Sequence, residues 1–260
     1  MIKVAHEVPL EYMKISRDIS DYDYALVHLF DHESLAVARQ YFMYFYESLQ
    51  QGREVILDNS AYELKGTYYD MHRYVEWINL LKPTYYVVPD VRNNSEKTIE
   101  ATKEWMREYV DSGVVSKDLK RMVVVHGKNL EEMQHTIDEL EQYCDKLSFS
   151  FEDYYFDIAK SKEDVGKVRY TEINKLHFTK PVHILGCILP QEFKLWKDDE
   201  RIDTIDTSSP ICNALESKDL TENMLEKPKV TINDAFLVEY TEKMAQKMIE
   251  NSKIFKKIIR

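Results

Sequence analysis

The chain has 260 residues, a length that α/β barrels commonly use as a single domain. Its 35 basic and 46 acidic residues give a net charge of −11, which excludes the uniformly basic surface of a nonspecific nucleic-acid coat. Hydrophobic residues make up 44% of the chain and charged residues 31%, so the composition is that of a globular protein rather than a disordered one.

The three cysteines, Cys144, Cys187 and Cys212, are widely spaced and form no C-x-x-C pair, so neither a disulfide framework nor a cysteine zinc site is visible. A reducing compartment fits this usage best. The charged first residues lack the uninterrupted apolar segment of a signal peptide, and no run approaches the length of a membrane span. We therefore expect a cytoplasmic protein that does not associate with membranes.

Short runs of β-branched, aromatic and other apolar residues recur along the chain and predict β-strands. In chain order they cover residues 24–30, 54–60, 85–91, 121–127, 146–151, 182–187 and 202–208. Segments with helical spacing stand between them, at residues 34–49, 95–110 and 129–144. In the last segment Leu130, Met133, Ile137 and Leu140 share one face, and Asn129 stands in the N-cap position.

This alternation of strand and helix predicts right-handed crossovers and a parallel sheet that is buried on both faces. No G-x-G-x-x-G motif follows the first strand and no G-x-x-x-x-G-K-[ST] motif occurs, which disfavours a Rossmann or P-loop fold. We predict a TIM-like (β/α)8 barrel of the α/β class, one domain over residues 1–260. Residues 1–20 would be an N-terminal extension and residues 232–260 a closing C-terminal helix. The eighth strand is either KVAHEV near the start or KVTIND at 229–234.

The carboxyl ends of barrel strands converge on one open face, and that face carries the chemistry. Polar or small residues end six of the predicted strands, so we expect them to line one pocket. They are Asp58, Asn59 and Ser60; Asp90; His126 and Gly127; Ser150 and Glu152; Gly186 and Cys187; and Asp206, Thr207 and Ser208. Other roles stay open, because an aspartate after a strand also caps helices or forms turns, and a lone histidine is often a core residue.

Two carboxyl groups in one semi-enclosed site can divide the chemistry, with one as the nucleophile and the other transferring protons. This division suits displacement at a sugar carbon through a covalent glycosyl intermediate. The spacing of the residues does not identify the leaving group.

Five segments resemble, in order and spacing, the strand-end motifs of tRNA-guanine transglycosylases, over about residues 20–212. They are ILDNSAYE (56–63), VVPDV (87–91), VVVHG (123–127), HILGCILPQE (183–192) and IDTIDTSSP (202–210). The similarity is greatest to the shorter, phage-type relatives that put 7-deazaguanines into DNA. The resemblance implies a glycosyltransferase, more narrowly a pentosyltransferase, that exchanges guanine in nucleic acid for a 7-deazapurine base, in DNA rather than tRNA.

The resemblance also implies roles for single residues. It places the general acid/base at Asp58 and the nucleophile that attacks C1′ at Asp206. If the motif is aligned in the other register, the nucleophile is Asp203. It places a stacking aromatic at Tyr62. The remaining substrate-binding residues that it implies are Asn59, Asp90, His126, Gly127, Leu185 and Gly186.

The chain departs from the family pattern at three places. The tRNA enzymes carry a C-x-C-x2-C…H zinc site towards the C-terminus, whereas only Cys212 stands in that region here. We therefore expect no zinc subdomain, no metal and no cofactor. His126 replaces a glutamine, which changes the hydrogen bonds available at the base edge. Ser60 and Ala61 replace a pair of glycines, and their side chains narrow the expected pocket on this side.

Phosphate binding needs lysine and arginine side chains. Residues 160–180 contain six basic and three acidic residues, a local net charge of +3, and we expect Lys160, Lys162, Lys167 and Arg169 to contact the nucleic-acid backbone. Two other functions stay open: an N-glycosidase or nucleoside hydrolase that uses the same aspartates on a small substrate, and a noncatalytic base-binding subunit of a modification complex. The sequence leaves the oligomeric state open.

Overall fold

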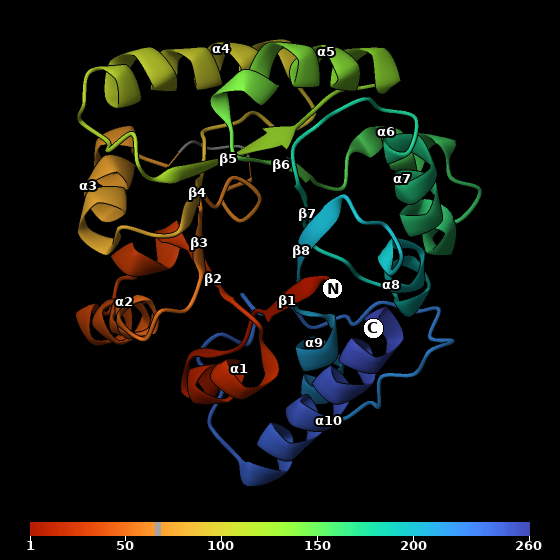
Figure 1. Cartoon of the computed structure of the whole chain (residues 1–260). Coiled ribbons are helices and arrows are strands. Elements are labelled where there is room, and N and C mark those ends of the chain that lie inside the picture. Colours follow the sequence, from red (N-terminus) through yellow and green to blue (C-terminus); the bar gives the residue numbers. More distant parts are fainter. Residues whose placement is uncertain (66–68) are drawn as a thin grey trace. The chain divides into compact units, whose positions relative to one another are not determined.

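The computed structural model describes residues 1–65 and 69–260. Within these residues eight parallel β-strands alternate with α-helices, which confirms the predicted TIM-like (β/α)8 fold class (Figure 1). Each of the seven apolar runs contains or overlaps a strand. The contacts divide the chain into two compact units, and each unit is built from segments that are separated in the sequence.

Unit 1 comprises Met1–Tyr22, Tyr155–Asn174 and Val182–Arg260. Its strands are parallel and pair in the order β1-β8-β7. Its strands and longer helices are β1 (Lys3–His6), α1 (Met13–Ile19), α7 (Val165–Ile173), β7 (Val182–Ile184), α8 (Pro190–Trp196), β8 (Ile202–Thr207), α9 (Ser209–Leu215) and α10 (Glu242–Ile259).

The early KVAHEV segment, and not KVTIND, supplies the remaining strand. In β1, Val4 pairs with Ile205 and Ala5 pairs with Asp206 of β8. Residues 229–234 form a bend, an irregular segment and the beginning of a turn instead, and the backbone N–H of Val230 donates to Glu216 Oε1 at 2.9 Å. Residues 3–6 are therefore part of the sheet, and the expected C-terminal helix begins only at Glu242.

Unit 2 comprises Asp23–Tyr154 and Lys175–Pro181. Its strands are parallel and pair in the order β2-β3-β4-β5-β6. Its strands and longer helices are β2 (Asp23–Leu26), α2 (Leu35–Gln50), β3 (Val55–Asp58), α3 (Met71–Leu81), β4 (Tyr85–Val87), α4 (Ser95–Trp105), β5 (Lys120–Val125), α5 (Leu130–Leu140) and β6 (Lys146–Phe149). The short helix α6 (Asp153–Ile158) contains the boundary between the units.

The strands of unit 2 are apolar without alternation because both of their faces are covered. Val55, Ile56 and Leu57 are consecutive in β3 and all fully buried, and residues 122–125 of β5 are likewise buried. Outside the sheet, α4 and α5 lie side by side (Figure 1). The Oδ1 atoms of Asn94 and Asn129 accept the backbone N–H of Lys97 and Glu132, at 3.0 and 2.9 Å, and fix where these helices begin.

The three cysteines are buried and free. Burial raises the pKa of the thiols of Cys144 and Cys212 to about 12. Burial also raises the pKa of Cys187 well above its ordinary value. These thiols therefore stay protonated near neutral pH and belong to the packed interior.

Candidate functional site

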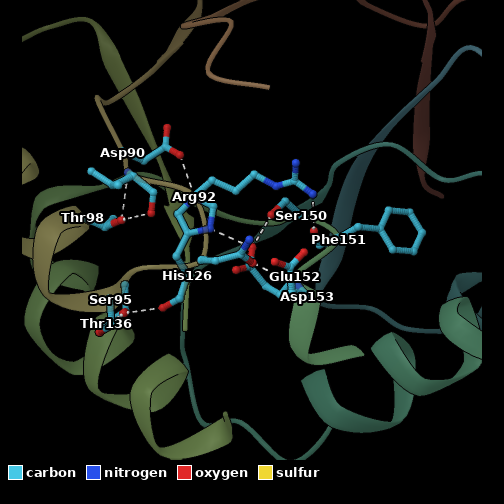
Figure 2. Close-up of polar contacts among 12 residues, drawn as sticks. Asp90, Arg92, Ser95, Thr98, His126, Thr136, Ser150, Phe151, Glu152 and Asp153 are labelled. Carbon is cyan, nitrogen blue, oxygen red and sulfur yellow. Dashed lines mark hydrogen bonds and ion pairs between the residues drawn. The ribbon is translucent and has the colours of Figure 1, made fainter. Parts of the chain in front are cut away.

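The ends of four neighbouring strands in unit 2 bring together a largely buried polar cluster, which we call the Asp90 cluster: Asn59, Asp90, His126, Ser150 and Glu152. Figure 2 shows Asp90, His126, Ser150 and Glu152 of this cluster. Asn59 Nδ2 donates to Asp90 Oδ1 at 2.6 Å. His126 Nε2 lies 2.6 Å from Asp90 Oδ2, and His126 Nδ1 lies 2.7 Å from Glu152 Oε1. Ser150 Oγ donates to the same Glu152 oxygen. Three residues predicted to bind substrate are thus in one hydrogen-bonded chain.

His126 is the cation of this cluster. Burial opposes its charge, but the electrostatic attraction of Glu152 and the hydrogen bonds with Asp90 and Glu152 outweigh burial and raise the pKa of His126 to about 10. The side chains of the three residues are at most 5% exposed. At neutral pH both ring N–H groups therefore donate to carboxyl oxygens of Asp90 and Glu152.

One atom of the cluster lacks a partner. Within residues 1–65 and 69–260, the buried Oε2 of Glu152 accepts no hydrogen bond. An unsatisfied buried acceptor costs roughly 1–3 kcal/mol, so it marks a position where a donor from a ligand would be stabilising. The cluster as a whole is rich in acceptors, and Glu152, which the sequence placed only among the strand-end residues that line the pocket, belongs to it.

Around the end of β3, the predicted residues occupy different environments. Asp58 is the last residue of the strand, and its Oδ2 accepts the backbone N–H of Ser60 at 3.3 Å. Ser60 has φ 61°, in the left-handed region that favours glycine. The resemblance to tRNA-guanine transglycosylases aligns a glycine with this position, and glycine adopts this backbone conformation without strain. Tyr62 is 68% exposed and presents its ring to solvent.

Gly127 has a packing reason to be glycine. A Cβ atom added there would lie 2.6 Å from the backbone nitrogen of Met133 in α5. The residue thus allows helix α5 to approach the end of β5. Its predicted contact with substrate stays a prediction.

In unit 1 a second group of polar residues surrounds the end of β8, and we call it the Asp206 cluster: His183, Gly186, Thr204 and Asp206. Asp206 Oδ1 accepts the backbone N–H of Gly186 at 2.9 Å and lies 3.1 Å from His183 Nε2. His183 Nδ1 lies 2.9 Å from Thr204 Oγ1. With Nε2 donating to the carboxyl group, a neutral imidazole accepts from the threonine hydroxyl. One oxygen of Asp206 is therefore held by two donors.

Asp203, the alternative nucleophile, lies near the beginning of β8. Asp203 is the second residue of the strand, and the pairing with β7 shifts register there, since Val182 pairs with Ile202 and His183 pairs with Thr204. His183 pairs in register with Thr204, which shares its face with Asp206. The geometry thus favours Asp206 as the strand-end carboxyl group.

The two predicted backbone contacts after β7 serve internal partners. The carbonyl of Leu185 accepts Arg169 Nη1 at 2.7 Å, and the N–H of Gly186 donates to Asp206. Gly186 has φ 64°, and this left-handed conformation turns its N–H into the Asp206 cluster. Both backbone groups therefore shape the site, and their contact with a base stays a prediction.

The prediction that Arg169 contacts a nucleic-acid backbone is wrong. Arg169 is fully buried, and its Nε donates to Glu192 Oε1 at 2.7 Å. Gly166 permits this close packing, since an added Cβ would lie 2.7 Å from the Cβ of Glu192. The other predicted contacts, Lys160, Lys162 and Lys167, are exposed. The guanidinium of Arg169 therefore balances a buried carboxylate and has no access to a phosphate.

Asp58 and Asp206 belong to different units, so their predicted convergence stays a prediction. In the described part of the chain, no group of three or more His, Cys, Asp or Glu side chains is arranged to hold a metal ion. Among the same residues, no helix combines the length and apolar character needed to cross a lipid bilayer.

No family model matches the chain, and no curated protein matches its sequence. The resemblance to tRNA-guanine transglycosylases therefore rests on the ordered motifs alone. Sequence reasoning missed His183, because its partners Thr204 and Asp206 become visible only when β7 and β8 pair. Glu152 was visible as a strand-end residue, but the sequence did not indicate that it faces His126.

Proposed function

We propose that this protein is a base-exchanging glycosyltransferase that replaces guanine in nucleic acid, DNA rather than tRNA, with a 7-deazaguanine. The observation that carries the proposal is the buried, acceptor-rich Asp90 cluster at the strand ends of a (β/α)8 fold. Enzymes of this fold class place catalytic and binding residues at the carboxyl ends of their strands. We assign base recognition to this cluster and covalent chemistry to Asp206.

The Asp90 cluster complements the edge of a guanine-type base. Guanine and its 7-deaza analogues carry N–H donors on the ring and on the exocyclic amino group. Asp90 and Glu152 offer carboxyl oxygens, and Glu152 Oε2 is a buried acceptor with no partner in residues 1–65 and 69–260. A base lacking these donors would leave buried acceptors unpaired, which is the strongest source of discrimination available to such a site.

Asp206 has the surroundings of a positioned nucleophile. The N–H of Gly186 and the ring of His183 hold one of its oxygens, which fixes the plane of the carboxyl group. In the proposed reaction the carboxylate attacks C1′ and forms a C–O bond. The C1′–N bond breaks, and its electron pair leaves with guanine, which takes a proton from Asp58. The incoming 7-deazaguanine returns a proton to Asp58 as its ring nitrogen displaces the carboxylate.

Access to C1′ requires the target nucleotide to leave the helix stack, which costs a few kcal/mol. The exposed ring of Tyr62 supports this step, since an aromatic face can stack on an extruded base. The pocket contacts then offset the lost stacking.

The test combines exchange with trapping of the intermediate. Purified protein is incubated with duplex DNA or tRNA and labelled 7-deazaguanine, and incorporation is counted. Asp206→Asn should abolish both incorporation and the covalent protein–nucleic acid adduct. Asp203→Asn, near the beginning of the same strand and away from its carboxyl end, is the matched control and should retain both. Full incorporation by Asp206→Asn would refute the assignment.

A second candidate, an N-glycosidase or nucleoside hydrolase, is favoured by the net charge of −11 and by the burial of Arg169. Both reduce the attraction of the protein for a polyanion. Release of free base from a nucleoside, without uptake of labelled base, would support this candidate. Nucleic-acid binding without turnover, unchanged in Asp206→Asn, would support the noncatalytic alternative.

A further inference from the structure

Arg92 stands beside the Asp90 cluster and belongs to none of the roles assigned so far. It lies two residues after Asp90 in the loop that follows β4, and its side chain is exposed. Figure 2 shows it extending towards Phe151, whose carbonyl accepts Nη2 at 3.4 Å. The guanidinium carbon also lies 5.1 Å from the centre of the Tyr62 ring, within the range of a cation–π contact.

Arg92 has no acidic partner among residues 1–65 and 69–260. Several other arginines do have such partners: Arg53 pairs with Asp23, Arg201 pairs with Asp199, and Arg169 pairs with Glu192. Most of the five N–H donors of Arg92 are therefore left for an external acceptor.

The loop that carries Arg92 is fixed on both sides. Thr98 Oγ1 donates to the carbonyl of Val91 at 3.0 Å and accepts the Val91 N–H at the same distance. Asn93 has φ 55°, and its Oδ1 accepts the backbone N–H of Asp153 at 3.0 Å. The guanidinium is thus presented from a preorganised backbone, which lowers the entropy lost when it binds a ligand.

An exposed aromatic ring next to an unpaired guanidinium combines the two contacts that proteins use on nucleic-acid strands: stacking on a base and charge-assisted hydrogen bonding to a phosphate. We propose that Arg92 binds a phosphate of the substrate strand beside the nucleotide that stacks on Tyr62. This inference rests on the proposed function, because it takes the substrate to be a polynucleotide. It also supplies a phosphate contact in place of the one that buried Arg169 cannot make.

The experiment measures the binding of a fluorescent single-stranded oligonucleotide by anisotropy across a range of salt concentrations. Losing one phosphate contact lowers the slope of log K against log salt by about 0.7 for a single strand. Arg92→Gln should show this decrease and a roughly tenfold weaker affinity at low salt, the lower end expected for a hydrogen bond to a charged group. Arg92→Lys, which keeps the charge, should retain the slope.

The matched control is Arg107→Gln, which removes the same charge from an exposed arginine in the helix that continues α4. At about 1.5 Å per residue, Arg107 is more than about 15 Å from the beginning of α4, and its loss should leave the slope unchanged. An Arg92→Gln slope equal to the wild-type slope, or an equal decrease in both variants, would overturn the inference. So would a wild-type protein that does not bind the oligonucleotide.

Competition separates the possible sources of phosphate. We expect an unlabelled oligonucleotide to compete far better than a nucleoside monophosphate or inorganic phosphate, because a strand occupies both Tyr62 and Arg92. Equal competition by the free anions would overturn the strand assignment. The result is also separable from the proposed chemistry. A slope change without base exchange refutes only the exchange, and exchange with an unchanged slope refutes only the role of Arg92.

Discussion

Raising the pH above neutrality should destabilise the protein through one buried side chain, His126. The carboxyl groups of Glu152 and Asp90 outweigh the burial of the ring and raise the pKa of His126 from 6.5 to about 10 in the folded protein. Its contribution to stability is therefore fully present below pH 6.5 and is lost as the pH rises through about 10. Between these values unfolding releases one proton from this residue.

The magnitude follows from linkage. One proton released on unfolding lowers the free energy of unfolding by about 1.4 kcal/mol per pH unit. From about pH 7 to about pH 8.5 the loss should be roughly 2 kcal/mol, against a total stability of about 5–15 kcal/mol for a typical domain. The upper limit keeps the measurement below the titration of thiols in the unfolded chain. The thiols of Cys144 and Cys212, with folded pKa values of about 12, would add a loss of the same sign at higher pH.

Urea unfolding followed by tryptophan fluorescence measures this slope. Trp105 in unit 2 and Trp196 in unit 1 are both buried, so both units report. His126→Gln should remove the slope, and Glu152→Gln should reduce it by removing one of the two carboxyl partners. A wild-type stability that is flat between these pH values, or a slope that persists in His126→Gln, would show that the imidazole is not the charged centre of the cluster.

Two further pairs of substitutions test the packing around the strand ends. Gly127→Ala places a Cβ 2.6 Å from the Met133 nitrogen and should lower the free energy of unfolding by about 2–3 kcal/mol. Gly186→Ala meets open space, and its only cost is the strain of a left-handed backbone, about 1–2 kcal/mol. The urea midpoint should therefore fall further for Gly127→Ala. Arg169→Met leaves Glu192 buried without its cation and should cost about 3–5 kcal/mol, while Lys167→Met at an exposed position should change stability by less than about 0.5 kcal/mol. Equal urea midpoints within either pair would contradict the reasoning.

Much of the fold was predictable because strands covered on both faces must be apolar along their whole length. The runs ending at Asp58 and at His126 carry that signal without ambiguity. The remaining strand was not predictable, since KVAHEV and KVTIND have similar local composition. The choice depends on which segment pairs with β8, and the local sequence of neither segment predicts such a nonlocal pairing.

The strand-end rule also located Asn59, Asp90 and His126, which the structure joins in one hydrogen-bonded chain. It did not indicate the direction of each side chain, so the contact of Glu152 with His126 was invisible. Arg169 was misassigned because the net charge of a segment does not reveal which face of a helix is buried. Its spacing of four from both Val165 and Ile173, two buried apolar residues, was the available signal.

The state of the sulfur atoms makes the protein a convenient host for site-directed labels. The native thiols are buried and protonated near neutral pH, so they should not react with a maleimide in the folded chain. The maleimide should react instead with a cysteine introduced at an exposed position. A reporter dye placed in this way on the loop of Arg92 would register the arrival of an oligonucleotide without any prior removal of Cys144, Cys187 or Cys212.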